Sequence, residues 1–368
     1  MRPEAHGGDL RAMAIISGCD AVQLLDFSVN VRPEGPPDFL LNAMRHSITR
    51  LAAYPSPHAD EACAAAAQRH TVPVTHFVFG NGSNELIHAL ARVLKKKSVP
   101  AAYIVEPAFS EYALACRLAG VEVRRIRGGI SAADGVGTAQ PGLHSIGEQL
   151  VQAPAGAAVF FANPGNPSGL FYPVAHCLPL LQMRSDLLWV VDEAFVEYVG
   201  PDDTASLVPH TLANVIVLRS LTKFYAVPGV RLGYMVAAPH LAETVRAEMP
   251  VWNVNTFAIA AAVAALEDTS VFAAQTRAQN AARRADLMGR LSALPDVEVF
   301  ASAANYVLFR CHGAQSGLGD TLLRNFGIAV RDCANYYGLE DGTWFRAAVR
   351  LPQEHERLAT ALRHCLSR

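Results

Sequence analysis

The stretch NVIVLRSLTKFYAVPGVRLGY, residues 214–234, decides the fold of this chain. It begins with a run of apolar residues, which is typical of a strand buried on both faces of a sheet. Lys223 follows that run and is flanked by Phe224 and Tyr225. Lysines usually lie on solvated surfaces, but apolar neighbours lower the pKa of a lysine and favour its attack on an aldehyde. The stretch therefore predicts a reactive lysine just past a buried strand.

Short apolar runs of the same kind recur along the chain and alternate with segments long enough for helices. They lie at 76–79, 101–105, 121–126, 157–162, 187–191, 214–219 and 231–236. Strands separated in this way imply a largely parallel sheet that helices cover on both faces. We therefore expect an α/β fold whose large domain spans residues 46–258.

The pattern changes after about residue 255. A long Ala-rich helical region at 256–293 leads to strand candidates at 305–310 and 345–350 and to a helix at 353–366. This order predicts a smaller α/β domain at 259–368. Residues 1–45 hold turns of Pro and Gly, so we expect an N-terminal arm that contributes to the small domain and the active site. Residues 128–143 are expected to form a flexible loop.

The composition argues against several classes of protein. Of the 368 residues, 51% are hydrophobic and 17% are charged, which suits a sizeable core. The net charge of −2 argues against nucleic acid or an anionic membrane as the main partner. The seven cysteines are scattered singly, as in a reduced protein without disulfides or a metal site. The N-terminus lacks the apolar core of a signal peptide, and we expect a cytoplasmic protein.

The motif GNGSNE, residues 80–85, follows one predicted strand and opens a helix. The free N–H groups at the start of a helix suit a phosphate. Gly82-Ser83-Asn84 is also an ordinary turn between a strand and a helix, with Ser83 or Asn84 as the helix cap. The motif alone does not decide between these two interpretations.

Further polar residues stand where other predicted strands end, which is where open α/β sheets bind ligands. Asp192 ends the run LLWVV, and its carboxylate either caps the next segment or needs a cationic partner. Ser220, Thr222 and Arg231 offer hydroxyls and a guanidinium suited to a phosphate dianion. An isolated arginine more often pairs with a surface carboxylate, so the joint occurrence of these residues carries the prediction of a ligand site.

Together, GNGSNE, NPGNPSG (163–169), VVDEAF (190–195) and SLTKFYAVPGVRLGY (220–234) resemble the fold-type-I enzymes that depend on pyridoxal 5'-phosphate. Within that family the chain is similar to the branch of histidinol-phosphate aminotransferases and L-threonine-O-3-phosphate decarboxylases. The order of the motifs and the spacing of Asp192, Lys223 and Arg231 carry the resemblance, which covers nearly the whole chain. It implies the aspartate-aminotransferase fold, with a mostly parallel mixed sheet in the large domain.

The resemblance implies a role for each matching residue. Lys223 binds the cofactor aldehyde and later moves protons, while Asp192 pairs with the pyridine nitrogen. Asn166 donates to the phenolic oxygen, and Phe109 stacks on the ring, although such an aromatic is more often core packing. Tyr54 resembles the tyrosine that reaches the cofactor phosphate from the other subunit, which implies a homodimer. The remaining residues expected around that phosphate are Gly82, Ser83, Asn84, Ser220 and Arg231.

One position departs from the aminotransferase pattern. Aminotransferases commonly place a tyrosine after Asp-Glu-Ala, where its hydroxyl also contacts the phenolic oxygen of the ring. This chain has Phe195 at that position, so we expect the hydrogen bond to be absent. The phenolic oxygen then depends more on Asn166.

Several stretches resemble the decarboxylases more closely than the aminotransferases, among them HGGDL (6–10), RDCANYYGL (331–339) and FRAAVR (345–350). In that resemblance Arg346 binds the substrate carboxylate, Arg331 and His6 bind the substrate phosphate, and Asn30 shapes the pocket. The alternatives are a mobile terminus for His6 and a strand-edge charge for Arg331.

The sequence therefore predicts a homodimeric enzyme that converts L-threonine O-3-phosphate to CO2 and (R)-1-amino-2-propanol O-2-phosphate. The resemblance places that product in cobalamin biosynthesis. The first alternative is an aminotransferase for histidinol phosphate or an aromatic amino acid, because substrate orientation alone selects the bond that breaks. The second is a non-catalytic cofactor-binding or regulatory protein, against which the intact set of Lys223, Asp192 and Arg231 argues.

Overall fold

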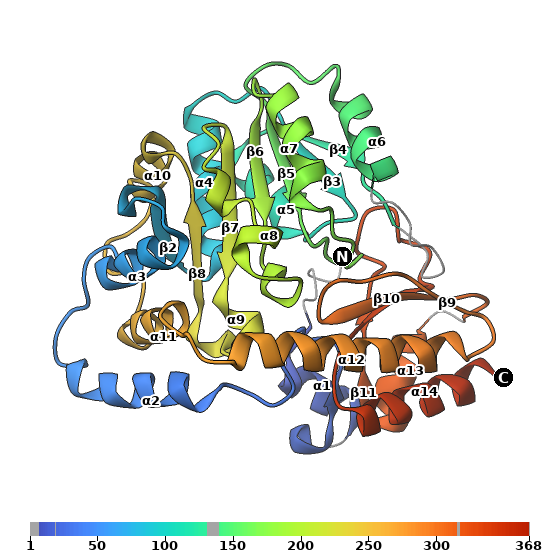
Figure 1. Ribbon diagram of the computed structural model, residues 1–368. Coiled ribbons are helices and arrows are strands. Elements are labelled where there is room, and N and C mark those ends of the chain that lie inside the picture. Colours follow the sequence, from blue (N-terminus) through green and yellow to red (C-terminus); the bar gives the residue numbers. More distant parts are fainter. Residues whose placement is uncertain (1–6, 19, 131–139, 315–316, 368) are drawn as a thin grey trace.

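Two sheets of unequal size organise the chain in the computed structural model (Figure 1). The structure describes residues 7–18, 20–130, 140–314 and 317–367. The large sheet has seven strands and the small one has four. The long helix α12 (Phe272–Ser292) runs from below the large sheet to the small one. The predicted α/β architecture with a mostly parallel mixed sheet is confirmed.

The large sheet contains all seven strands that the apolar runs predict. Its strand order is β2-β8-β7-β6-β5-β3-β4. Only β8 runs antiparallel to its neighbours, so β2, β3, β5, β6 and β7 end at the same edge as the start of β8. The bounds of the strands are Phe77–Asn81 (β2), Ala102–Glu106 (β3), Val123–Arg127 (β4), Ala158–Ala162 (β5), Leu188–Asp192 (β6), Val215–Ser220 (β7) and Leu232–Val236 (β8).

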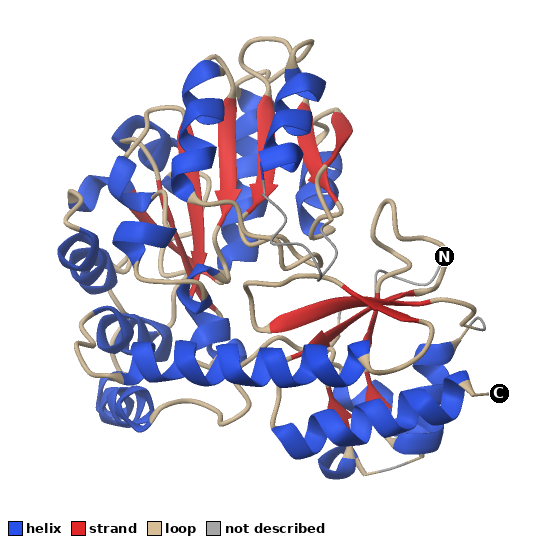
Figure 2. Ribbon diagram, turned by 45° about the vertical axis from the view of Figure 1, so that its right-hand side comes forward, coloured by secondary structure: helices blue, strands red, loops and turns tan. Residues whose placement is uncertain are grey.

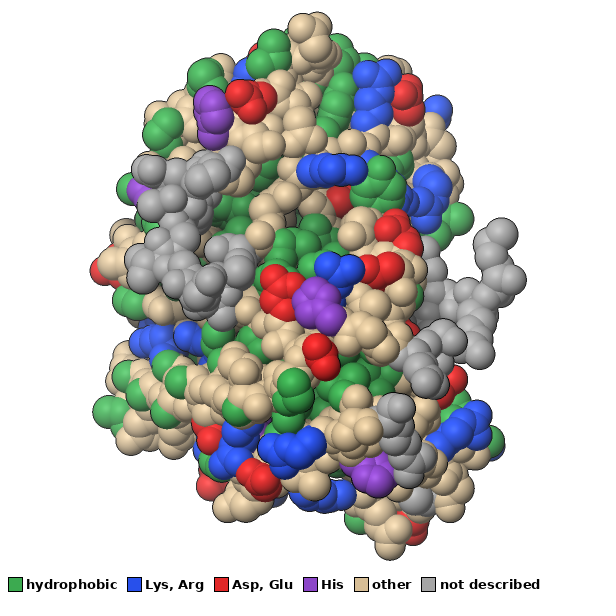
Figure 3. Space-filling model, turned by 90° about the vertical axis from the view of Figure 1, so that its right-hand side faces the viewer, with side chains coloured by type: hydrophobic (Ala, Val, Ile, Leu, Met, Phe, Trp, Pro, Cys, Tyr) green, Lys and Arg blue, Asp and Glu red, His purple; other side chains and the backbone are tan. Residues whose placement is uncertain are grey.

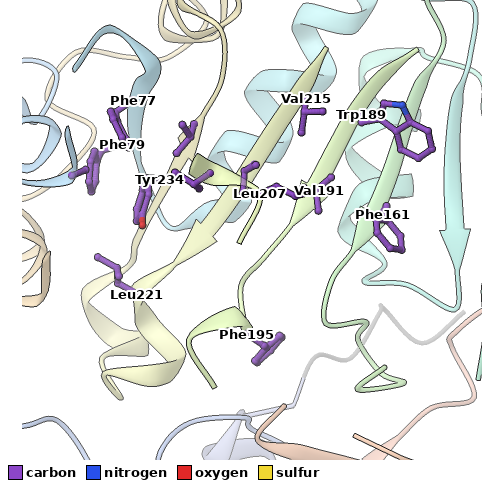
Figure 4. Close-up of a cluster of buried hydrophobic side chains, with 14 of the residues drawn as sticks. Phe77, Phe79, Phe161, Trp189, Val191, Phe195, Leu207, Val215, Leu221 and Tyr234 are labelled. Atoms are coloured by element: carbon purple, nitrogen blue, oxygen red, sulfur yellow. The ribbon is translucent and has the colours of Figure 1, made fainter. Parts of the chain in front are cut away.

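Successive side chains of the central strands enter two separate cores, one on each face of the sheet. Phe161, Trp189 and Val191 lie in one core (Figure 4), whereas Phe160 and Val190 lie in the other. This is the alternation expected when both faces of a parallel sheet are buried. It explains why the strand runs are almost continuously apolar in the sequence.

Helices cover both of these faces (Figure 2). Helices α4 (Ser83–Lys96), α5 (Glu111–Ala119) and α10 (Pro239–Arg246) contribute apolar residues to one core. The other core takes residues from α2 (Asp38–Ser47), α3 (Asp60–His70), α6 (Gln140–Leu150), α7 (Val174–Met183) and α11 (Thr256–Leu266). Two single-turn helices, α8 (Asp202–Ala205) and α9 (Leu221–Phe224), lie in the connections on either side of β7.

The small sheet is antiparallel and has the order β12-β13-β10-β9. A short parallel pair, β1 (Leu25–Asp26) with β11 (Ile328–Ala329), lies beside it in the same core. The strands span Val297–Val299 (β9), Tyr306–Cys311 (β10), Arg331–Asp332 (β12) and Trp344–Ala348 (β13). Helices α1 (Leu10–Ser17), α13 (Leu318–Phe326) and α14 (Pro352–Leu366) complete this part of the chain.

Two predictions about local structure are wrong. The helical region at 256–293 is two helices, because Asp268 accepts a hydrogen bond from the backbone N–H of Ser270, and the Ser270 hydroxyl accepts one from that of Phe272. Such side-chain bonds compete with the helical ladder. The loop predicted at 128–143 ends earlier, since α6 begins at Gln140, and residues 131–139 lie outside the described part.

The N-terminal segment is attached to both parts of the molecule. The backbone N–H of Phe27 donates to the carbonyl oxygen of Ala329, and the carbonyl oxygen of Phe27 accepts from the N–H of Ala348, both in the small unit. Further along, the backbone N–H of Arg32 donates to the carbonyl oxygen of Lys223, 3.3 Å away. Residues 27–32 therefore form a bridge between the small sheet and the reactive lysine.

Acidic and basic side chains are interspersed on the face shown in Figure 3, as expected from the near-balanced charge of the chain. Within the described ranges, no helix combines the length and apolarity needed to cross a membrane.

A buried arginine holds together the loops that follow β6. Arg219 is only 2% exposed, and its Nη1 lies 2.9 Å from Asp202 Oδ1 and 3.7 Å from Glu193 Oε2. Its Nη2 donates to Glu197 Oε1 at 2.8 Å. Burial raises the pKa of Glu193 to about 7 in spite of the nearby guanidinium. The cluster fixes the backbone directly beside Asp192, because Glu193 is the next residue.

We predict that Arg219→Leu strongly destabilises the fold. The substitution leaves Glu193 and Glu197 in a low-dielectric interior without their cation, which costs about 3–5 kcal/mol. Urea unfolding followed by circular dichroism measures the loss. Arg124→Leu is the matched control, because Arg124 is an exposed strand arginine with surface partners and should cost under about 1 kcal/mol. Equal effects in the two variants would show that the buried cluster contributes little.

Candidate active site

A cavity of about 370 Å³ opens at the edge where the parallel strands end. Residues from the small sheet and from the N-terminal segment complete its wall. Most of the residues predicted from the sequence to form a site line this one cavity: Asn30, Gly82, Ser83, Asn84, Phe109, Asn166, Asp192, Ser220, Lys223, Arg231, Arg331 and Arg346. His6 lies outside the described residues, although its neighbour Gly7 lines the cavity.

Lys223 lies in α9, immediately after β7, and its amine faces the cavity. Burial, together with the positive charges of Arg231 and Arg346, lowers its pKa from 10.5 to about 8, while Asp192 opposes the shift. Its carbonyl oxygen accepts a hydrogen bond from Tyr198 Oη at 3.0 Å. The Tyr198 bond therefore holds the backbone in place, and about half of the amine is neutral and nucleophilic near pH 8.

Asp192 ends β6 and is the buried carboxylate of the site. Its Oδ2 accepts a hydrogen bond from Tyr112 Oη at 2.5 Å, and its Oδ1 accepts one from the backbone N–H of Ala194 at 2.9 Å. Burial raises the pKa of Asp192, and these two bonds and Lys223 act against that rise. The pair of donors fixes the orientation of the carboxylate toward the cavity.

Tyr112 was not predicted from the sequence as a site residue. It is the second residue of α5, three residues after Phe109, and is almost completely buried. The one available signal is its place in the segment that follows the end of β3, because ligand sites of open α/β sheets lie there. The apolar pattern of α5 makes Tyr112 look like a core residue, because a buried tyrosine usually packs in a core.

Gly82, the start of α4 and Arg231 form a compact anion cradle. Gly82 has φ = +83°, and a Cβ atom there would meet Arg231 Nη2 at 2.7 Å, so only glycine lets the guanidinium lie against the turn. Ser220 Oγ and Thr222 Oγ1 lie 2.9 Å apart beside it. The buried Asn84 Oδ1 has no hydrogen-bond partner among the described residues. Helix N–H groups, hydroxyls and a guanidinium together suit a phosphate dianion.

Asn166 connects the two sheets across the cavity. Its Oδ1 accepts a hydrogen bond from Arg346 Nη1 at 2.5 Å and one from Tyr336 Oη at 3.4 Å. Both donors belong to the small unit, whereas Asn166 follows β5 of the large sheet. With its oxygen taken by two donors, the amide offers its N–H groups to a ligand in the cavity.

Two guanidinium groups enter the cavity from neighbouring strands of the small sheet. Arg331 on β12 is directly opposite Arg346 on β13, and both side chains are buried. Arg346 Nη2 also donates to the carbonyl oxygen of Ser28 at 2.9 Å, while Arg331 Nη2 donates to Asn335 Oδ1 at 2.8 Å. Two buried cations with neutral partners form a site for anionic groups of a substrate.

Two phenylalanines that line the cavity, Phe109 and Phe195, each pack edge-on against a tyrosine. Phe109 lines the cavity and meets the ring of Tyr112 edge-on, with centroids 5.7 Å apart. Phe195 also lines the cavity, and its ring meets that of Tyr306 edge-on at 4.9 Å. Without a hydroxyl, Phe195 makes no hydrogen bond to a ligand from this position.

Tyr54 lies away from the cavity of its own chain. Its side chain is 81% exposed and packs on the ring of Trp252 at 4.8 Å. Within one chain, Tyr54 therefore does not contribute to the cavity. Its predicted place in the cavity of a second copy stays a prediction.

These residues fit pyridoxal 5'-phosphate in chemistry and arrangement. The anion cradle suits its phosphate, Lys223 suits its aldehyde, and the oriented carboxylate of Asp192 suits a protonated ring nitrogen. The N–H groups of Asn166 suit its phenolic oxygen.

Comparisons with known proteins agree with this geometry. Residues 22–362 match the family described as aminotransferase class I and II. The chain is 36% identical to threonine-phosphate decarboxylase of Salmonella typhimurium, over 99% of this chain and 97% of that protein. It is 31% identical to histidinol-phosphate aminotransferase 1 of Cupriavidus pinatubonensis, over 99% and 94%. Histidinol-phosphate aminotransferase of Clostridium acetobutylicum superposes with a TM-score of 0.82 at 25% identity, over 94% and 99%. The chain belongs to the class I and II aminotransferase family of pyridoxal-phosphate-dependent enzymes.

Proposed function

We propose that this enzyme decarboxylates L-threonine O-3-phosphate to CO2 and (R)-1-amino-2-propanol O-2-phosphate, a reaction that would serve cobalamin biosynthesis. The pair of buried arginines, Arg331 and Arg346, that line the same cavity as Lys223 carries the proposal. Threonine phosphate has a carboxylate and a phosphate beside its amine, and each anion needs a cationic partner in a buried site. Histidinol phosphate has a phosphate but no carboxylate. The 36% identity to a threonine-phosphate decarboxylase supports the same choice.

The proposed roles follow from the contacts of each residue. Lys223 would hold the cofactor aldehyde, and its amine would carry a proton near the reacting carbon. Asp192, oriented by Tyr112, would keep the ring nitrogen protonated. Arg331 and Arg346 hold the two anionic groups, so that the bond from the α-carbon to the carboxylate is fixed relative to the ring.

The reaction breaks one carbon–carbon bond and needs one proton. The carboxylate leaves as CO2, the electron pair remains on the substrate side, and a proton then adds to the α-carbon. Bound pyridoxal phosphate supplies the electron sink that stabilises this pair. Asp192 and both arginines are buried, which strengthens their electrostatic contacts with a ligand in the cavity.

We also propose that residues 46–258 act as the large cofactor-binding domain and 259–368 as the small domain, with residues 1–45 as an arm that supplies Asn30. In this proposal the enzyme is a homodimer. Tyr54, Trp252 and Leu51 are exposed large side chains in neighbouring loops, where a second copy would bury them. The hydroxyl of Tyr54 would then reach the cofactor phosphate of the partner subunit.

We predict that Tyr54→Phe keeps the dimer but loosens the cofactor about tenfold, because one hydrogen bond to a charged phosphate is lost. Analytical ultracentrifugation measures the oligomeric state, and fluorescence titration of the apoprotein measures pyridoxal-phosphate affinity. His58→Ala, a change at a neighbouring exposed residue, is the control. A wild-type monomer with unchanged affinity in the variant would refute both the dimer and the role of Tyr54.

We predict that the apoprotein captures pyridoxal phosphate faster as the pH rises through about 8. Below the pKa of about 8, the amine of Lys223 is protonated and cannot attack the aldehyde, whereas above it the neutral amine predominates. Visible absorbance after rapid mixing follows the capture. Lys223→Ala should show no absorbance band from a lysine-bound cofactor. A band that persists in Lys223→Ala and can be fixed on a lysine by borohydride would assign the cofactor to another residue.

We predict that the cofactor-loaded enzyme releases CO2 from L-threonine O-3-phosphate and keeps its cofactor in the aldehyde form. Replacing Arg346 or Arg331 by Met should lower kcat/KM by at least about a hundredfold, because a buried anion loses its partner. Trapping of labelled CO2 measures turnover. Conversion of the cofactor to its amine form by histidinol phosphate, without CO2 release, would assign the enzyme to the aminotransferases instead.

A further inference from the structure

We propose that Tyr336 is a positioning residue that keeps the amide of Asn166 turned with its N–H groups toward the cofactor. The inference rests on the proposed function in that it assumes pyridoxal phosphate at Lys223. The motif RDCANYYGL indicated a small-domain segment near the substrate, but the sequence did not single out either of its tyrosines.

Tyr336 belongs to the small unit but reaches into the cavity of the large one. Its side chain is buried and lines the cavity, and its hydroxyl lies 3.4 Å from Asn166 Oδ1. The face of its ring lies under the guanidinium of Arg331, with Arg331 Cζ 5.2 Å from the centroid. One side chain thus contacts both a candidate cofactor ligand and a candidate substrate ligand.

The amide of Asn166 needs more than one donor to keep its orientation during catalysis. Of the two hydrogen bonds that Asn166 Oδ1 accepts, the one from Arg346 is the shorter, at 2.5 Å. When a substrate anion binds Arg346, the guanidinium has to share its N–H groups between that anion and Asn166. Tyr336 is neutral and has no charge to attract the substrate anion. Its hydroxyl therefore still donates to the Asn166 oxygen when Arg346 binds that anion.

Because Phe195 has no hydroxyl, the phenolic oxygen depends on the orientation of the Asn166 amide. Phe195 lines the cavity but cannot donate a hydrogen bond to a phenolic oxygen. If the Asn166 amide turned over, its oxygen would face the anionic phenolic oxygen and repel it. A donor that fixes the amide therefore controls the charge on the ring oxygen.

Tyr336→Phe tests the proposal, because it removes the hydroxyl and keeps the ring that carries Arg331. The readout is the pH titration of the visible absorbance of the cofactor bound to Lys223, recorded with saturating propionate, a carboxylate without an amine that engages Arg346 and cannot replace Lys223 on the cofactor. A weaker donor to the ring oxygen destabilises the deprotonated cofactor, so the midpoint should rise by about half a pH unit. The charged residues that line the cavity are Glu111, Asp192, Lys223, Arg231, Arg331 and Arg346, and all are unchanged in this variant.

The adjacent tyrosine provides a matched control. Tyr337 is 41% exposed, and its ring packs under Arg125 instead of Arg331. Tyr337→Phe should therefore leave the midpoint and the activity unchanged. With threonine phosphate, Tyr336→Phe should lower kcat about threefold to tenfold with little change in KM, whereas Tyr336→Leu should also raise KM because Arg331 loses its ring.

The outcomes separate the two proposals. A midpoint that does not move in Tyr336→Phe, or that moves equally in Tyr337→Phe, overturns the role of Tyr336 even if CO2 is released. A shifted midpoint in an enzyme that releases no CO2 supports the role of Tyr336 and overturns the proposed substrate. If the wild-type enzyme never acquires the absorbance band, both proposals are wrong.

Discussion

The parallel pairing of β6 with β7 is the constraint on which the rest of the site depends. Asp192 pairs in register with Leu218, so the carboxylate and the loop that carries Lys223 leave the sheet side by side. A shift of β6 by one residue would turn the side chain of Asp192 to the other face of the sheet. The two groups can then be desolvated together, and each shifts the pKa of the other. The anion cradle joins them because β8 runs antiparallel and brings Arg231 to the same edge.

The second organising contact links the small sheet to this edge. Arg346 reaches Asn166 of the large unit and the carbonyl oxygen of Ser28 in the N-terminal segment. The same segment donates to the backbone of Lys223 through Arg32. Arg346 is therefore connected to Lys223 through the N-terminal segment, and to the large sheet through Asn166.

The strands and the main site residues were predictable because their signals are local. A continuous apolar run followed by Asp192 or Lys223 can be recognised without knowing how the rest of the chain folds. Tyr112 and Tyr336 were missed because each hydrogen-bonds a residue that is distant in sequence. Tyr112 also stands in an apolar segment, where a tyrosine looks like a core residue. The break between α11 and α12 was missed because the side chains of Asp268 and Ser270, which read as ordinary polar helix residues, bond to the backbone instead.

The choice between decarboxylation and transamination rests on orientation, since Lys223, Asp192 and the anion cradle serve both reactions. A rotation of the substrate about its bond to the cofactor decides which bond lies perpendicular to the ring, and that bond is the one that breaks. Arg331 and Arg346 are opposite each other on antiparallel strands, so the small sheet sets the separation of their backbones. Under the proposed function, a substrate with one anion could rotate about a single arginine. A substrate with two anions would be held at both, and the geometry of the two strands would then select the reaction.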